Sequence, residues 1–139
     1  MPCLEISLPK TDLATKRELC SRLTDLVEDV AGFERQIFRI RFSEYEPGEA
    51  GSGGVIWDGE NGVPYLHAVL YCPRLKRSTK QRLVENLMQI FPEILRHPDW
   101  FPVVHICEHP YDNIGGSGTW LPTRPGLAER QFYYELPKD

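Results

Sequence analysis

The sequence lacks an excess of positive charge and lacks any long hydrophobic run. Sixteen Lys and Arg residues stand against twenty Asp and Glu residues, which gives a net charge of −4. Such a chain offers no general field to a phosphate backbone, so we predict that nucleic acid is not a partner. Its apolar runs fall well short of the roughly 18 residues that a membrane-spanning helix needs, so we expect no membrane partner.

The sequence is also poor in the features of secreted proteins. Its first ten residues, MPCLEISLPK, have neither the basic start nor the long apolar stretch of a signal peptide, so we predict a cytoplasmic protein. The four cysteines lie far apart and form no CxxC pair; they are Cys3, Cys20, Cys72 and Cys107. Because they fall in segments typical of strand or helix interiors, we predict four buried, reduced thiols rather than a disulfide framework.

The composition is that of a soluble globular protein. Of the 139 residues, 41% are hydrophobic and 26% are charged. A chain of this length suits one hydrophobic core and is short for two. We therefore predict a single domain over residues 1–139.

Two copies of one unit account for most of the chain. Shifting the sequence by 64 positions aligns Pro9 with Pro73. The same shift aligns further pairs without a gap: Thr15 with Thr79, Lys16 with Lys80, Leu19 with Leu83, Leu23 with Leu87, Glu44 with Glu108, Gly51 with Gly115, and Gly54 with Gly118. A register kept over this length indicates a duplication. We place the repeats at about 2–54 and 64–118, followed by a C-terminal tail at 119–139.

Each repeat predicts a largely buried strand followed by an amphipathic helix. Short apolar stretches at Leu4–Leu8 and Leu66–Cys72 favour strands. Apolar residues then recur at helical spacing in both copies: Leu19, Cys20, Leu23, Leu26, Val27 and Val30, and Leu83, Val84, Leu87, Ile90, Phe91 and Ile94. A helix with one apolar stripe needs a sheet beneath it.

The predicted helices carry recognisable start and stop residues. Asp12 or Thr11 can accept hydrogen bonds from the first turn of the first helix, and Gly32 is a plausible stop for it. Ser78 with Gln81 predicts a capping-box start for the second helix.

A second strand completes each unit, at Ile37–Phe42 and Val103–Cys107. In the first of these, apolar residues alternate with Arg39 and Arg41, so the two arginines share one face. The predicted fold is α+β: two βαβ units share one four-stranded sheet, with both helices on one face. The other face would be apolar and uncovered, so we expect it to meet another subunit.

Two further segments lie outside the βαβ units. Glu49–Gly62 is rich in Gly and contains Trp57, which predicts a loop or short hairpin packed by an aromatic ring. The segment from Gly115 is similar. Gln131–Leu136 has the aromatic content of a short strand that could pair with an exposed sheet edge.

A strand that begins with Pro2, followed by a helix and a second strand and then repeated in one chain, resembles the tautomerase superfamily. The likeness covers nearly the whole chain. It is greatest for the cis-3-chloroacrylic acid dehalogenase branch, which has close counterparts of FSEYEPGEAGSGGV, of the LTD in the first helix, and of GTWLPTRPG. The resemblance implies a homotrimer of two-unit subunits with active sites near subunit boundaries, and it implies no cofactor.

The resemblance also assigns roles to residues. It makes Pro2 the catalytic group once Met1 is removed, with one site per subunit because the second repeat begins in mid-chain and has no free amine. Arg74 and Arg77 match, with a one-residue insertion, two arginines that bind the substrate carboxylate in that branch.

Three other functional positions of the branch do not carry over. Its helix-one histidine falls on Val27, its tyrosine on His105 and its C-terminal glutamate on Gly116. The glutamate and the tyrosine are held to activate water in that branch, so these departures weaken the expectation of dehalogenation.

The chemistry of the residues fits an acid/base role for Pro2. Its secondary amine would titrate near the ordinary 7.7 to 8.0 of an α-amine, and an apolar pocket or nearby cations would favour the neutral form that accepts a proton. One such group contributes roughly 10² to 10⁴ in rate, so cations must complete the site. Arg74 and Arg77 can hold a carboxylate, and Arg39 and Arg41 can polarise a developing enolate.

The remaining candidates are substrate-binding residues. His105, at the repeat position of Arg41, is a possible second acid or hydrogen-bond donor. Phe38, Trp57 and Trp120 are possible apolar walls. The predicted activity is that of a cofactor-independent keto/enol tautomerase acting on a small 2-oxo or unsaturated carboxylate.

Several alternatives stay open at this point. The protein could be a hydratase or dehalogenase of the cis-3-chloroacrylic acid type, or a non-catalytic binding module on the same fold. The arginines have an ordinary alternative as solvated charges. Another hypothesis is a zinc or iron site at His105, Cys107, His109 and Asp112, but strand rise spreads the first three over about 13 Å, so we predict no metal.

Overall fold

Two central strands show the alternation that a half-covered sheet requires. A computed structural model describes residues 2–123. In β1 (Cys3–Pro9), Leu4, Ile6 and Leu8 are buried and the residues between them are not, and β5 (Tyr65–Cys72) alternates in the same way. The two strands pair antiparallel, with Cys3 opposite Tyr71. This antiparallel pairing places the start of β1 beside the end of β5.

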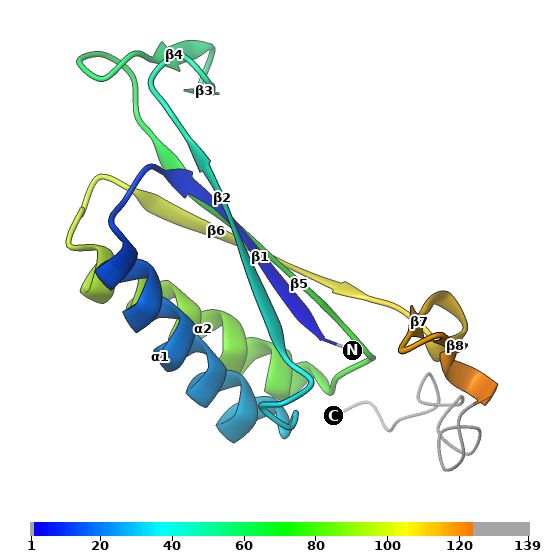
Figure 1. Cartoon of the computed structure of the whole chain (residues 1–139). Coiled ribbons are helices and arrows are strands. Elements are labelled where there is room, and N and C mark those ends of the chain that lie inside the picture. Colours follow the sequence, from blue (N-terminus) through cyan, green and yellow to red (C-terminus); the bar gives the residue numbers. More distant parts are fainter. Residues whose placement is uncertain (1, 124–139) are drawn as a thin grey trace.

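Each central strand has a parallel partner on its outer side. Strand β2 (Arg39–Tyr45) pairs with β1, and β6 (Phe101–Glu108) pairs with β5, so the sheet order is β2-β1-β5-β6. The chain crosses between parallel partners through a helix, and both helices cover the same face (Figure 1). The predicted architecture of two βαβ units sharing one sheet is confirmed.

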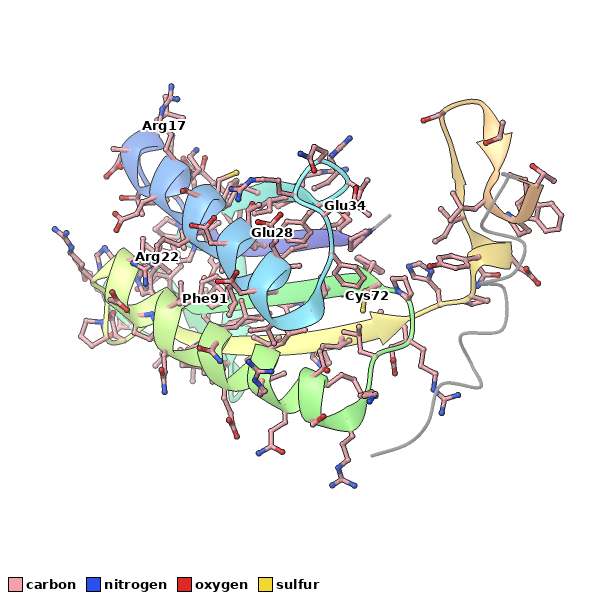
Figure 2. All side chains as sticks on the ribbon, turned by 90° about the horizontal axis from the view of Figure 1, so that it is seen from below. Arg17, Arg22, Glu28, Glu34, Cys72 and Phe91 are labelled. Carbon is pink, nitrogen blue, oxygen red and sulfur yellow. The ribbon has the colours of Figure 1, made fainter. Side chains whose placement is uncertain are left out.

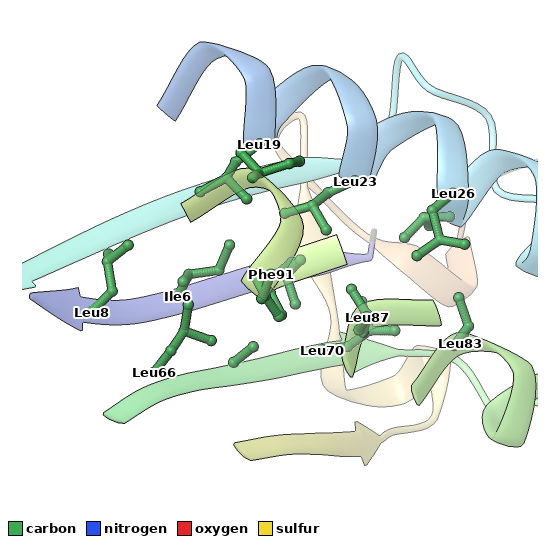
Figure 3. Packing of buried hydrophobic residues seen from close by; sticks show 14 of the residues in the cluster. Ile6, Leu8, Leu19, Leu23, Leu26, Leu66, Leu70, Leu83, Leu87 and Phe91 are labelled. Atoms are coloured by element: carbon green, nitrogen blue, oxygen red, sulfur yellow. The ribbon is translucent and has the colours of Figure 1, made fainter. Parts of the chain in front are cut away.

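The two helices bury their apolar stripes against the sheet and against each other. Helix α1 (Leu13–Ala31) and helix α2 (Arg77–Leu95) have identical lengths and begin 64 residues apart, as the sequence repeat predicts. Phe91 and the leucines of both stripes meet those of β1 and β5 in one core (Figure 3). Burial of these apolar side chains stabilises the packing of the helices on the sheet, and this packing fixes the positions of the sheet ends from which the loops depart.

The helix ends test three sequence predictions. Asp12 caps α1, since its Oδ1 accepts a hydrogen bond of 2.6 Å from the Thr15 amide. Gly32 ends α1 in the left-handed conformation, as predicted. The predicted capping-box start of α2 at Ser78 is wrong, because α2 begins at Arg77 and its N-cap residue is Lys76, whose side chain makes no capping hydrogen bond.

The repeat extends into two small hairpins. One pairs β3 (Ala50–Ser52) with β4 (Val55–Trp57), and the other pairs β7 (Gly115–Gly116) with β8 (Thr119–Trp120). Both turn through two residues with positive φ, 64 positions apart: Gly53 and Gly54 in the first, and Ser117 and Gly118 in the second. Short 3-10 turns at Tyr111–Asn113 and Leu121–Thr123 flank the second hairpin. Both predicted hairpins are therefore present.

The uncovered face of the sheet is more polar than expected. Because Leu4, Ile40 and Ile106 face the helices, alternation places their neighbours on the open face. On β1 and β2 these are Glu5, Ser7, Arg39, Arg41 and Ser43, and on β5 and β6 they are Tyr65, His67, Val69, Tyr71, Phe101, Val103, His105 and Cys107. The prediction of an apolar open face therefore holds for β5 and β6, where its apolar residues are concentrated, and is wrong for β1 and β2.

Other predictions on the chain's periphery have mixed outcomes. Cys72 is buried and Cys3 is partly buried, but Cys20 and Cys107 are exposed, so the prediction of four buried thiols is wrong. The predicted strand at Gln131–Leu136 lies outside the described residues. Neither helix of residues 2–123 is long and apolar enough to cross a membrane.

Candidate active site

Pro2 lies at one end of the sheet, immediately before β1. It is fully buried, and its carbonyl oxygen accepts a hydrogen bond of 3.2 Å from the amide of Arg39, at the start of β2. The end of β5 lies at the same end of the sheet, because β5 runs antiparallel to β1. Figure 2 shows Cys72, the last residue of β5, at this end, with the β7–β8 hairpin extending beyond it. Cys72 in turn pairs with Glu108, which ends β6.

The two arginines of the loop after β5 lie at the Pro2 end for the same reason. Arg74 follows Cys72 by two residues and is partly buried, whereas Arg77 is the first residue of α2 and is exposed. The N-terminus of α2 therefore points its positive dipole end toward this region. One helix terminus with two guanidinium groups is suited to a carboxylate.

The two tryptophans proposed as walls lie at opposite ends of the sheet. Trp120 is on β8 at the Pro2 end, is 54% exposed, and donates a hydrogen bond of 2.8 Å from Nε1 to the carbonyl oxygen of Asp112. Trp57 is on β4 at the far end, where its ring lies edge-on to Tyr45 with 5.8 Å between ring centroids. Within one chain, only Trp120 belongs to the same region as Pro2 (Figure 1).

The remaining candidates lie on the open face. Arg39 is closest to Pro2 along the sheet, and its guanidinium donates to the backbone carbonyls of Gln36 and Phe38. Arg41 lies two residues further along β2. His105 lies on β6, separated from β1 by β5, which is roughly 10 Å at ordinary strand spacing. One chain alone therefore does not bring His105 to Pro2.

Phe38 faces the other way. It is only 6% exposed and belongs to the hydrophobic core, where it packs beneath the helices. Its position just before β2 still makes it part of the apolar surroundings of the Pro2 end.

The electrostatic environment next to Pro2 is mixed. Burial raises the pKa of the Cys3 thiol, and Glu5 adds to that rise, whereas Arg41 and Arg39 oppose it. Both arginines therefore act on atoms one residue from Pro2. Next to Pro2, one carboxylate and two guanidinium groups therefore have opposite effects.

No group of three or more His, Cys, Asp or Glu side chains within residues 2–123 is arranged to hold a metal ion. His105, Cys107, His109 and Asp112 therefore do not form such a group in the described part of the chain. His105 instead shares a 2.8 Å contact between its Nδ1 and the Nε2 of His67 on β5. The sequence pattern around His67 indicates only a structural or exposed histidine and does not predict this pair.

A shallow hollow of about 490 Å³ lies between α1 and β2. Its lining includes Lys16, Arg17, Arg41 and Glu44, but not Pro2. The hollow belongs to the first repeat, away from the arginine loop of the second. It is not the site that the sequence predicts.

The sequence neither matches a protein-family model nor has a match among curated proteins, whereas many solved structures match the fold. A native fused 4-OT is 27% identical, with a TM-score of 0.73 over 86% of this chain and 95% of its own. N1, a member of the cis-3-chloroacrylic acid dehalogenase family, is 21% identical, with a TM-score of 0.71 over 97% of this chain and 92% of its own. Pt0534, solved after inactivation by 2-oxo-3-pentynoate, is 20% identical, with a TM-score of 0.77 over 89% of this chain and 98% of its own.

These likenesses and the repeat define the class of the molecule: it is a two-unit βαβ protein with both helices on one side of a shared sheet. Its structural neighbours are tautomerase superfamily members, both of the fused 4-OT kind and of the cis-3-chloroacrylic acid dehalogenase family. We therefore assign the chain to the tautomerase superfamily.

Proposed function

We propose that the protein is a cofactor-independent keto/enol tautomerase that acts on a small 2-oxo or unsaturated carboxylate. The observation that supports the proposal is strand direction: β1 begins at the end of the sheet where β5 ends, so Pro2 lies at the same end as the loop with Arg74 and Arg77. An amine that moves a proton and cations that hold an oxyacid are the two requirements of enolisation.

The reaction follows from these roles. Arg74 and Arg77 bind the carboxylate, and the neutral amine of Pro2, released by removal of Met1, carries a proton between the enol oxygen and C3 of the substrate. An apolar pocket or nearby cations would disfavour the charged form of that amine and favour the neutral form, which accepts a proton. Enolisation moves negative charge onto oxygen, where a guanidinium stabilises it.

The homotrimer is part of the same proposal. Fused 4-OT proteins among the structural neighbours were solved as trimers. In this chain the sheet face opposite the helices carries Val69, Val103 and Phe101 beside charged side chains, so covering it with another copy would bury apolar surface. In the trimer, Arg41 or His105 of a neighbouring copy would complete the Pro2 site.

Ketonisation of phenylenolpyruvate tests the activity. We expect the processed wild-type protein to catalyse it and Pro2→Ala to lose at least about 100-fold in kcat/KM, because one placed acid/base group contributes roughly that much. Intact mass must first show that Met1 is absent. Full activity in Pro2→Ala would remove the proposal.

A second candidate is a hydratase or dehalogenase of the cis-3-chloroacrylic acid type. The observation that favours it is the N1 likeness, which extends over 97% of this chain. The loss of water-activating groups at His105 and Gly116 counts against it. Halide release from either isomer of 3-chloroacrylate would support this candidate, and its absence would dismiss it.

A further inference from the structure

One carboxylate ties the arginine loop to the sheet. Glu108, the last residue of β6, accepts a hydrogen bond of 2.6 Å at Oε2 from the amide of Leu75. Its Oε1 lies 2.9 Å from Nζ of Lys80, on the first turn of α2. Charge-assisted hydrogen bonds of this length are stronger than neutral ones. Both contacts are partly shielded from water, since the side chains of Lys80 and Glu108 are 34% and 24% exposed.

These two contacts bracket the residues that we propose bind the substrate carboxylate. The Leu75 amide belongs to the peptide bond that follows Arg74, and Lys80 lies one helical turn after Arg77. A further hydrogen bond of 3.0 Å, from the His109 amide to the Cys72 carbonyl, fixes the strand end from which the loop departs. The loop is thus held by its backbone on one side and by the first turn of α2 on the other.

The first repeat contains the same device at the opposite end of the sheet. Glu44 accepts a hydrogen bond of 2.7 Å from the Thr11 amide at Oε2, and its Oε1 lies 2.8 Å from Nζ of Lys16. The side chains of Lys16 and Glu44 are 23% and 26% exposed, close to the values of the other pair. Thr11, Lys16 and Glu44 each precede their counterparts in the second repeat by 64 residues, so the fold supplies an internal control.

We propose that Glu108 is a positioning residue for Arg74 and Arg77, whereas Glu44, in the equivalent contact, serves the fold alone. The inference rests on the proposed function, in which these arginines hold a carboxylate. Losing either carboxylate removes one backbone anchor and one ion pair, so both losses destabilise the protein to a similar extent. Only the loss of Glu108 loosens guanidinium groups that face a ligand, and a displacement on the order of 1 Å in such a group is costly for binding.

Matched variants of the processed, full-length protein test the proposal. Glu108→Ala and Glu44→Ala are compared by thermal unfolding, by the Kd of phenylpyruvate in isothermal titration, and by KM and kcat with phenylenolpyruvate and its methyl ester. We expect similar losses in Tm, a Kd and a KM for the acid about tenfold higher in Glu108→Ala only, and no such difference for the ester, which has no carboxylate charge. Glu108→Gln, which keeps an acceptor for the Leu75 amide, should recover part of the loss and also replaces Glu108→Ala if that variant unfolds.

Equal effects of the two substitutions on Kd would overturn the proposal, and so would a loss in Glu108→Ala that is the same for acid and ester. No binding of phenylpyruvate by the wild-type protein would overturn it too. Failure of the proposed function is a separate result, because a protein that binds phenylpyruvate through this loop but does not ketonise the enol retains the positioning role and loses the activity.

Discussion

The repeat predicts that one substitution far from the candidate site stabilises the protein. Gly32 and Arg96 occupy equivalent positions after α1 and α2, and both are left-handed, with φ of 72° and 59°. Each donates its amide to the carbonyl four residues earlier, at 3.0 Å. Glycine adopts this conformation without steric cost, whereas an arginine does not. Arg96→Gly should therefore raise the free energy of unfolding.

The magnitude follows from two opposing terms. The left-handed conformation costs a residue with a Cβ roughly 1–2 kcal/mol. Glycine also makes the unfolded chain more flexible, which offsets roughly 0.4–1 kcal/mol of the stabilisation. The net stabilisation by Arg96→Gly is about 0.5–1 kcal/mol, which corresponds to a rise in Tm of about 2–5 °C for a domain of this size. The Arg96 side chain is exposed, so little packing is lost.

The reverse change provides the control. A Cβ built on Gly32 would meet no atom within 4 Å, so Gly32→Ala tests backbone conformation alone. We expect it to lower the unfolding free energy by about 1 kcal/mol. Urea unfolding of both variants, with unchanged m values, measures the two effects. A loss of stability in Arg96→Gly, or no loss in Gly32→Ala, would show that the left-handed conformation does not control stability at these positions.

Two further predictions follow from shifted pKa values. Hydrogen bonds from Lys16 and the Thr11 amide lower the pKa of Glu44 below its ordinary 4.5, so its stabilising contribution is present at neutral pH and is lost as pH falls through the lowered value; the Tm of Glu44→Gln should be below wild type at pH 7, the difference should shrink as the pH falls below 4.5, and a constant difference would contradict this. Burial raises the pKa of Cys72 to about 12, so iodoacetamide at pH 8 should alkylate exposed Cys20 in the folded protein and Cys72 only after unfolding, which peptide mass mapping checks.

The architecture is predictable from the sequence because its determinants are periodic and duplicated. The apolar stripes of α1 and α2 and the alternation in β1 and β5 each predict one element, and the offset of 64 residues joins them into equal units. The start of α2 is harder to predict, because Ser78 matches a capping pattern, whereas the equivalence with Asp12 places the N-cap at Lys76. A comparison of the two repeats at this position gives the correct boundary.

The candidate site is less predictable than the fold. The start of β1 and the end of β5 lie at the same end of the sheet because the two strands are antiparallel. Pro2, Arg74 and Arg77 can therefore be grouped from the order and direction of the strands alone. Trp57 cannot be excluded in this way, because its position depends on where a hairpin leaves the sheet. The role of Glu108 is visible in the sequence only as a repeat match with Glu44, since hydrogen bonds across 33 residues leave no local pattern.

Reaction with 2-oxo-3-pentynoate shows whether Pro2 carries a neutral, reactive amine. A structural neighbour, Pt0534, was inactivated by this acetylenic 2-oxo acid. A neutral amine at Pro2 would add to C4, the alkyne carbon β to the ketone, and form a nitrogen–carbon bond. The amine proton would move to C3. Peptide mass spectrometry should then find one reagent molecule on the N-terminal peptide at Pro2, with loss of activity and protection by phenylpyruvate. An unmodified Pro2 in inactivated protein, or adducts on Cys20 or Cys107 alone, would exclude Pro2 as the reactive amine.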